Sequence, residues 1–159
     1  MVTMARMLAS MALALACACG STSGSDAGTG PTGDDAPLFV GTWTGSLSLT
    51  DATSGSVIQS GQTSFPIVEL ASNSISLQDA CPDGTDLTAT VTSATQFVLS
   101  AAFACPAVSV SSCSSLVVTF ETLTGTLASS SLSMTGSITE VGCEQTVNAN
   151  LSFGPATKG

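Results

Sequence analysis

From Leu38 to the C-terminus, apolar and polar residues alternate along the chain with a period of two. The odd positions between Phe39 and Leu49 are apolar or glycine, and most even positions are Ser or Thr. The same alternation returns in the segments that begin at Leu87, Phe97, Leu116, Leu132 and Val147. Because successive side chains of a strand point to opposite faces, this pattern predicts strands with one buried face and one face of solvated hydroxyl groups.

Short breaks rich in Ser, Gly or Asp separate these segments and predict tight turns between neighbouring strands. The predicted strands span 39–50, 55–60, 63–70, 73–79, 86–92, 95–104, 115–127, 131–140 and 145–153. The buried phase changes after Phe120, which predicts a β-bulge or a division of that strand. We therefore expect an all-β domain, an up-and-down antiparallel meander of about eight strands closed into a small barrel, with a two-sheet β-sandwich as the alternative.

The N-terminus has a different pattern. Arg6 precedes an almost wholly apolar run from Met7 to Ala16, which is too short to span a membrane and is typical of a secretory signal peptide. Small residues and two cysteines follow. This stretch resembles the lipobox of bacterial lipoproteins, in which a cysteine is diacylated and becomes the first residue of the mature chain. The resemblance implies lipidation of Cys19, or alternatively of Cys17, and an outer-membrane lipoprotein. Simple cleavage and secretion is the alternative.

The stretch from Gly20 to Ala36 contains only Gly, Ser, Thr, Asp, Pro and Ala. Such a segment buries too little apolar surface to offset its ordering entropy, so we predict a disordered linker. The predicted organisation is a lipoprotein signal peptide at 1–18, a Gly/Ser/Asp-rich linker at 19–37 and a β-barrel domain at 38–159.

The start of the folded region carries Gly41-Thr42-Trp43. It resembles the Gly-x-Trp of the first strand in lipocalin-like and avidin-like barrels. The resemblance implies a barrel, and we expect Trp43 to be a core anchor at its closed end, with a ligand contact as the alternative. Lipocalins cover this tryptophan with an arginine from a late strand, and the folded region has none. Avidin-type biotin sites use several tryptophans and a tyrosine, and this chain has one Trp and no Tyr, so biotin binding is not expected.

Four cysteines lie in the folded region: Cys81, Cys105, Cys113 and Cys143. An even number of cysteines in an exported domain predicts disulfides. Reflecting the chain about the turn at Ser93 and Ala94 places Cys105 beside Cys81. Reflecting it about the turn near Ser129 places Cys143 close to Cys113. We therefore predict the pairs Cys81–Cys105 and Cys113–Cys143. Without a histidine or a CxxC spacing, no metal site is expected.

The charge of the chain excludes several functions. It has 11 acidic residues, two basic residues and no histidine, and its net charge is −9. Lys158 is the only cation of the folded region, so we expect neither nucleic acid nor attraction to anionic lipid. The chain lacks the bases that nucleophilic catalysis requires, which predicts a protein that is not an enzyme and needs no cofactor. A calcium site at Asp83-Gly84-Thr85-Asp86 is a weaker alternative. Glu69 shares its phase with Ile67 and is expected to point into the barrel.

Two functions remain. The first is a membrane-tethered barrel that binds a small lipophilic ligand at its open end; the alternative is a structural or surface-interaction lipoprotein without a ligand. Free volume is favoured by small residues that we expect to face inward: Ala89, Ala101, Gly125, Gly136 and Ala149. The rim is expected to be acidic through Asp51, Asp79, Asp83 and Asp86. Such a rim favours neutral or cationic ligands over anionic ones.

Overall fold

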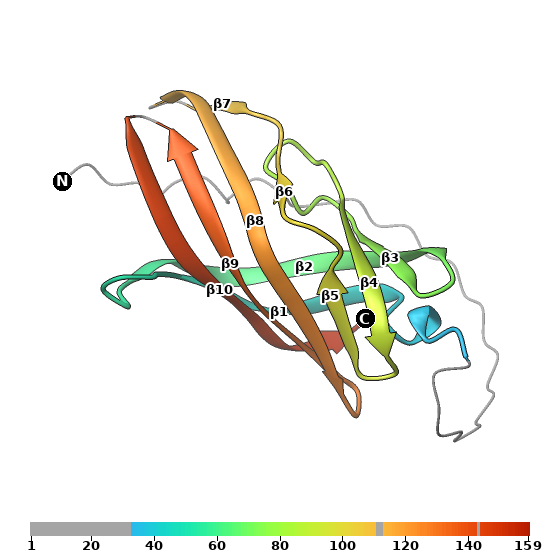
Figure 1. Ribbon diagram of the computed structural model, residues 1–159. Coiled ribbons are helices and arrows are strands. Elements are labelled where there is room, and N and C mark those ends of the chain that lie inside the picture. The colour runs from blue at the N-terminus through green and yellow to red at the C-terminus, as the bar shows by residue number, and fades with distance from the viewer. Residues whose placement is uncertain (1–32, 111–112, 143) are drawn as a thin grey trace. The chain divides into compact units, whose positions relative to one another are not determined.

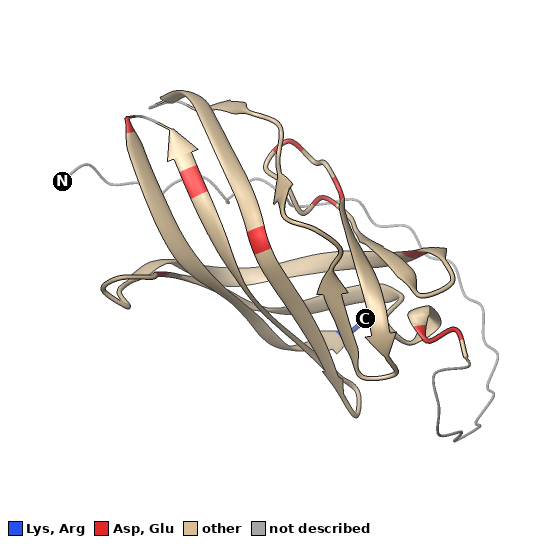
Figure 2. Cartoon of the chain, in the orientation of Figure 1, with Lys and Arg blue, Asp and Glu red and all other residues tan. Residues whose placement is uncertain are grey.

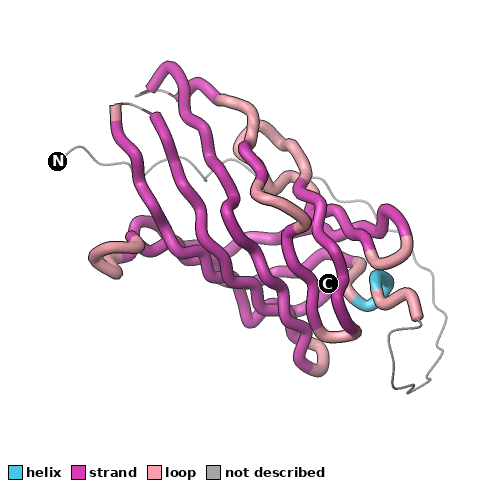
Figure 3. Tube along the Cα trace, in the orientation of Figure 1, coloured by secondary structure: helices cyan, strands magenta, loops and turns pink. Residues whose placement is uncertain are grey.

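The chain folds into an antiparallel sheet whose hydrogen-bonded ladder returns on itself. The computed structural model describes residues 33–110, 113–142 and 144–159, and those from Asp34 onward belong to one compact unit. Its strands are β1 (Gly41–Asp51), β2 (Val57–Ala71), β3 (Ser74–Leu77), β4 (Leu87–Ser93), β5 (Gln96–Leu99), β6 (Phe103–Ala104), β7 (Val108–Val110), β8 (Cys113–Ala128), β9 (Ser131–Gly142) and β10 (Gln145–Lys158). Figures 1 and 3 show their arrangement.

The strand order confirms the predicted all-β meander. Neighbours in the sheet run β5-β4-β3-β2-β1-β10-β9-β8, and β5 also pairs with β8. Setting aside β6 and β7, which pair only with β8, eight strands form a closed antiparallel ring. The pairing is continuous around the ring and is not divided between two sheets. The predicted irregularity after Phe120 is also present, because the β8–β9 register shifts between Phe120 and Thr122.

Several strand boundaries differ from the prediction. β2 is one strand from Val57 to Ala71, whereas the sequence predicts two strands, 55–60 and 63–70, with a break at Gly61 between them. Its register with β1 is uninterrupted from Gly41↔Ile67 to Leu49↔Gln59, so pairing with β1 overrides the low strand propensity of glycine. The predicted strand 95–104 is wrong, since β5 ends at Leu99 and the next paired residues, in β6, join β8.

The folded unit also begins before the predicted boundary at Leu38. A short 3₁₀ helix, η1 (Ala36–Leu38), precedes β1, and Ala36 is fully buried. An Asp34 carboxylate oxygen accepts hydrogen bonds from the backbone N–H groups of Asn73 and Ala36, at 3.0 Å and 3.1 Å. These polar contacts, rather than apolar burial alone, order the last residues of the predicted linker. The predicted signal peptide and both candidate lipidation sites lie outside the described residues.

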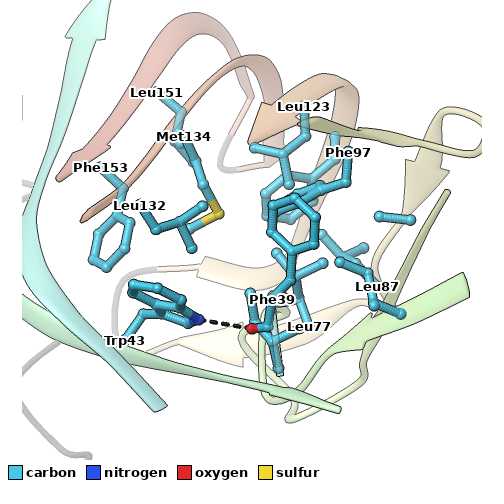
Figure 4. Packing of buried hydrophobic residues seen from close by; sticks show 14 of the residues in the cluster. Phe39, Trp43, Leu77, Leu87, Phe97, Leu123, Leu132, Met134, Leu151 and Phe153 are labelled. Carbon is cyan, nitrogen blue, oxygen red and sulfur yellow. Dashed lines mark hydrogen bonds between the residues drawn. The ribbon is translucent and has the colours of Figure 1, made fainter. Parts of the chain in front are cut away.

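Aromatic side chains fill the interior of the ring of strands at the end where β1 begins (Figure 4). Phe39 is fully buried and packs edge-to-face on Phe97 of β5, with ring centroids 5.3 Å apart. Trp43 is 2% exposed, and its indole N–H donates to the Phe39 carbonyl oxygen at 2.7 Å. Trp43 is thus a core residue, and its one polar atom has a partner despite its burial.

Away from that end, the ladder is incomplete. β2 pairs with β3 only over Ile67–Ala71, and β5 pairs with β8 only at residues 124–126 of β8. Residues 57–65 of β2 have β1 as their only neighbouring strand among the described residues. We call these residues the free edge of β2. We call the part of the sheet beyond the β2–β3 pairing the open half; in Figure 1 the β1–β2 hairpin extends well past β3.

Candidate functional site

The inner face of the open half carries one acidic side chain among apolar ones. On β9, Glu140 lies two residues after the buried Ile138 and is therefore on the same face of the sheet. Its directly paired neighbours are Val118 of β8 and Val147 of β10. Val118 is buried, and both Glu140 and Val147 are half-buried. Because directly paired residues project to the same side, the Glu140 side chain lies between two valines.

The electrostatic setting of Glu140 is unusual for a carboxylate. Burial raises the pKa of Glu140 above its ordinary value. Within residues 33–110, 113–142 and 144–159, no hydrogen bond or ion pair to its carboxylate is found. The only cation of this unit, Lys158, lies at the other end of β10, eleven residues from Val147 and therefore on the order of 30 Å along the strand. Glu140 thus presents a negative charge without a counter-charge.

Partly exposed apolar side chains lie on the other strands of the open half. Leu47 of β1 and Phe65 of β2 pack against the core without being fully covered. Phe65 also packs edge-to-face on Phe153 of β10, with ring centroids 5.0 Å apart. Phe103 of β6 is partly buried in the same way. These side chains offer hydrocarbon contact at the open half.

The predicted acidic rim consists of carboxylates that cap their own loops. Asp51 accepts hydrogen bonds from the backbone N–H groups of Thr53 and Ser54, at 3.0 Å and 2.6 Å, and these bonds lower the pKa of its carboxyl. The Thr85 hydroxyl donates to Asp83 at 2.6 Å and lowers the pKa of that carboxyl. Both groups therefore stay ionised at neutral pH. Figure 2 shows acidic residues at loops, strand ends and along β8 and β9.

The predicted calcium loop forms a network within itself. Asp86 accepts hydrogen bonds from the Asp79 backbone N–H and the Ser76 hydroxyl, each at 3.0 Å. Among the described side chains, no three acidic or cysteine groups converge in a way that could hold a metal ion. The Asp83 and Asp86 carboxylates serve to fix the β3–β4 connection.

The prediction that the Glu69 side chain points into the ring of strands is wrong. Glu69 is exposed, and it lies beside Asp34 at the end where η1 begins. Partial desolvation, and then the hydrogen bond and charge of the Asp34 carboxyl, raise the pKa of Glu69. The alternation correctly placed Glu69 on the face of its paired neighbour Ile75, but this position is the last one before the core ends.

The small residues that were expected to leave free volume at one end of the barrel do not form such a cluster. A Cβ atom on Gly125 would overlap the Phe97 ring, so this aromatic side chain already occupies the space. Ala101 is exposed and lies between β5 and β6 instead of facing inward. Ala89 and Ala149 are buried, and Gly136 lies against the backbone of β8 at Thr122. The expected cluster at one end is therefore wrong.

Sequence reasoning missed the role of Lys158. Its ammonium group lies over the Trp43 ring, 5.8 Å from the centroid, although the side chain is exposed. A Cβ atom on Gly41 would collide with the aliphatic part of Lys158, so the glycine leaves a path for that chain. A cation from the last strand thus covers the tryptophan of the first strand. The β1–β10 pairing Trp43↔Lys158 brings the two together, and no short-range sequence signal could have shown it.

One of the two predicted disulfides is present among the described residues. Cys81 and Cys105 are joined, with Cα atoms 5.6 Å apart. Cys143 lies outside the described residues, so the pair Cys113–Cys143 stays a prediction. The β8–β9 register supports it, because a Cβ atom on Gly142, the residue before Cys143, would lie 3.2 Å from the Cys113 sulfur.

Comparisons with known proteins give little further guidance. No family model matches the chain, and no curated protein matches it either. A crystal structure of a proposed outer membrane protein from Bacteroides fragilis is similar, with 14% identity and a TM-score of 0.43. The similarity covers 79% of this chain and 53% of that protein, so the chain spans about half of its length. In the described part of the chain, no helix is long and apolar enough to cross a membrane.

Proposed function

We propose that the protein is a lipid-anchored, non-catalytic protein of the cell envelope that binds a small lipophilic cation on the inner face of the open half. The observation that carries the proposal is Glu140, a half-buried carboxylate between Val118 and Val147 without a counter-charge in the described residues. The resemblance of Gly41-Thr42-Trp43 to the first strand of lipocalin-like barrels, which hold small ligands, supports a binding role. The predicted lipobox supports the envelope location.

The chemistry favours a ligand with an ammonium group and a hydrocarbon body. An ammonium group beside Glu140 restores the interactions that the carboxylate lost on leaving water, and it shifts the pKa back down. Hydrocarbon contacts are available from partly covered side chains such as Leu47 and Phe65. A hydrogen bond to a charged group contributes about 1.5–3 kcal/mol, which corresponds to roughly ten- to hundredfold in affinity. Neutral lipophiles bind more weakly, and anionic ones are repelled by the rim.

The test compares three ligands with the same alkyl chain and different head groups. The full-length protein is placed in lipid nanodiscs and titrated calorimetrically with decylammonium, decanol and decanoate, with empty nanodiscs as the blank. We expect the cation to bind most tightly. Glu140→Gln should weaken the cation at least tenfold and leave decanol unchanged. Glu121→Gln, at an exposed position of β8, is the matched control and should change neither.

Two results would oppose the proposal. Preferential binding of decanoate contradicts the charge argument, and equal binding of the cation by the wild type and Glu140→Gln removes Glu140 from the site. If none of the three ligands binds, the structural lipoprotein without a ligand becomes the better interpretation.

A further inference from the structure

The free edge of β2 exposes backbone hydrogen-bonding groups that no described strand uses. The Pro66 carbonyl oxygen points to this edge, because it accepts a hydrogen bond from the Gln78 backbone N–H at 2.9 Å where β3 begins to pair. In a strand, the N–H and C=O of one residue point to the same edge and alternate from residue to residue. The register with β1 is regular from Gln59 to Pro66. Ser64, Gln62 and Ser60 therefore present their backbone groups to the free edge.

This edge lacks the features that usually prevent pairing with another chain. Edge strands are commonly protected by charged side chains, proline or bulges. From Ala52 to Val68 the sequence contains no Asp, Glu, Lys or Arg, and residues 57–65 contain no proline. The only register shift with β1 lies near the hairpin, between Leu49 and Thr50. Beside the edge, Val57 is 63% exposed and Ile58 is 36% exposed.

The partner that fits such an edge is an extended strand. The charge distribution indicates which chain can supply that strand. All 11 acidic residues except Asp26 lie between Asp34 and the C-terminus, with Lys158 as the only cation. Two molecules of this kind repel each other over most of their surfaces. The stretch 52–68 carries no charge, so no like charges of two copies oppose each other along this edge. The chain's own segment Gly20–Gly33 is a poor competitor, because Gly, Ser, Asp and Pro disfavour strands.

We propose that two copies of the chain pair antiparallel through the free edges of β2 and form a twofold-symmetric dimer. An antiparallel edge is its own complement, as an isologous interface requires. With the axis near Gly61 and Gln62, Ser60, Gln62 and Ser64 of each copy supply the new backbone hydrogen bonds. Val57 and Ile58 of one copy then lie near Phe65 and Pro66 of the other, which buries exposed apolar surface. This inference does not depend on the proposed ligand.

The test uses charge at the axis. The full chain is studied in density-matched detergent by sedimentation equilibrium over a range of protein concentrations. The Gln62 side chain is exposed, and its amide N–H donates to the Ser46 hydroxyl at 2.8 Å, so we expect the fold to tolerate Gln62→Lys and Gln62→Glu. We expect the wild type to dimerise, and each variant alone to dissociate at least fivefold more readily, since like charges meet across the axis. A one-to-one mixture of the two variants should restore the dimer.

The salt dependence of the wild-type dimer and the mixture of the two variants provide two further checks on the proposed dimer. The wild-type dimer should tighten at high salt, because its acidic surfaces are screened. A wild type that stays monomeric at several hundred micromolar overturns the proposal. So do variants that dimerise as well as the wild type, or a mixture that associates no better than either variant alone.

Discussion

At the scale of single residues, the backbone of Gly41 and the side chains of Trp43 and Lys158 form one unit. Lys158 passes over Gly41 and places its ammonium above the Trp43 ring. A cation–π contact whose cation is exposed to solvent, as Lys158 is, contributes about 0.5–1 kcal/mol. We expect Lys158→Met to lower the free energy of unfolding by about that amount in urea denaturation, and Lys158→Arg to retain it. A loss of equal size in the arginine variant would show that packing of the lysine chain, and not its charge, matters.

Glu140 gives a prediction about pH. Burial raises the pKa of its carboxyl in the folded chain, so the folded state holds this proton to a higher pH than the unfolded state. Folding therefore becomes less favourable as the pH rises from the ordinary glutamate value to the raised one. We expect Glu140→Gln to be more stable than the wild type at pH 7 and equally stable once the pH falls below the ordinary value. Urea denaturation at several pH values measures this.

The matched control for that series is Glu121→Gln, because Glu121 is exposed at the bulge of the neighbouring strand. This variant removes the same charge from an exposed position and therefore controls for the change in net charge. A Glu140→Gln variant that is less stable at neutral pH would mean that the carboxylate has a favourable partner in the native protein. That result would also weaken the proposed ligand site.

At the scale of elements, the closure of the ring depends on a glycine opposite an aromatic residue. Phe97 of β5 pairs with Gly125 of β8, and its ring occupies the position of a Cβ atom on that glycine. We expect Gly125→Ala to destabilise the protein by about 1–3 kcal/mol or more, because the core there is already full. Gly61→Ala is the control: a Cβ atom on Gly61 has open space, so this change should be neutral. Thermal unfolding distinguishes the two.

The alternation of apolar and polar residues predicted the strands correctly where the observed strand pairing follows the same alternation. The phase change after Phe120 and the β8–β9 turn follow from alternation alone, because the buried face fixes the register. Gly61 misled the prediction, since local propensity indicated a turn while the long partner β1 keeps the chain extended. The segment after Leu99 was assigned to the wrong neighbour. Alternation reports which face is buried and does not report which strand lies alongside.

The candidate site was harder to predict for the same reason. Glu69 and Glu140 both share the phase of buried neighbours, and the sequence singled out Glu69. What separates them is the position of each along the ring. Glu69 lies where the core ends beside η1, whereas Glu140 is flanked by Val118 and Val147 on two adjacent strands. That flanking depends on the registers of three consecutive strands, β8, β9 and β10, and a single alternating segment does not contain it.

At the scale of the whole molecule, the Cys81–Cys105 disulfide ties two irregular connections together. Cys81 in the β3–β4 connection is joined to Cys105, which follows β6. The loop it closes has a sequence separation of 24, for which the chain-entropy argument gives about 3 kcal/mol of stabilisation. Non-reducing peptide mapping should recover this pair and also Cys113 with Cys143. A peptide that joins Cys105 to Cys113 would contradict the observed strand order.

The last prediction concerns the proposed lipid anchor. The folded unit has a single cation, so the proposed membrane attachment rests on a covalent lipid and not on electrostatic attraction to anionic lipid. We expect metabolic labelling with a radioactive fatty acid to mark the protein, Cys19→Ser to abolish the label, and the variant to leave the membrane fraction. Cys17→Ser is the matched control and should keep the label; the opposite result would move the lipid to Cys17. A variant with both cysteines replaced that still sediments with membranes would contradict the lipid anchor and require a different mode of attachment.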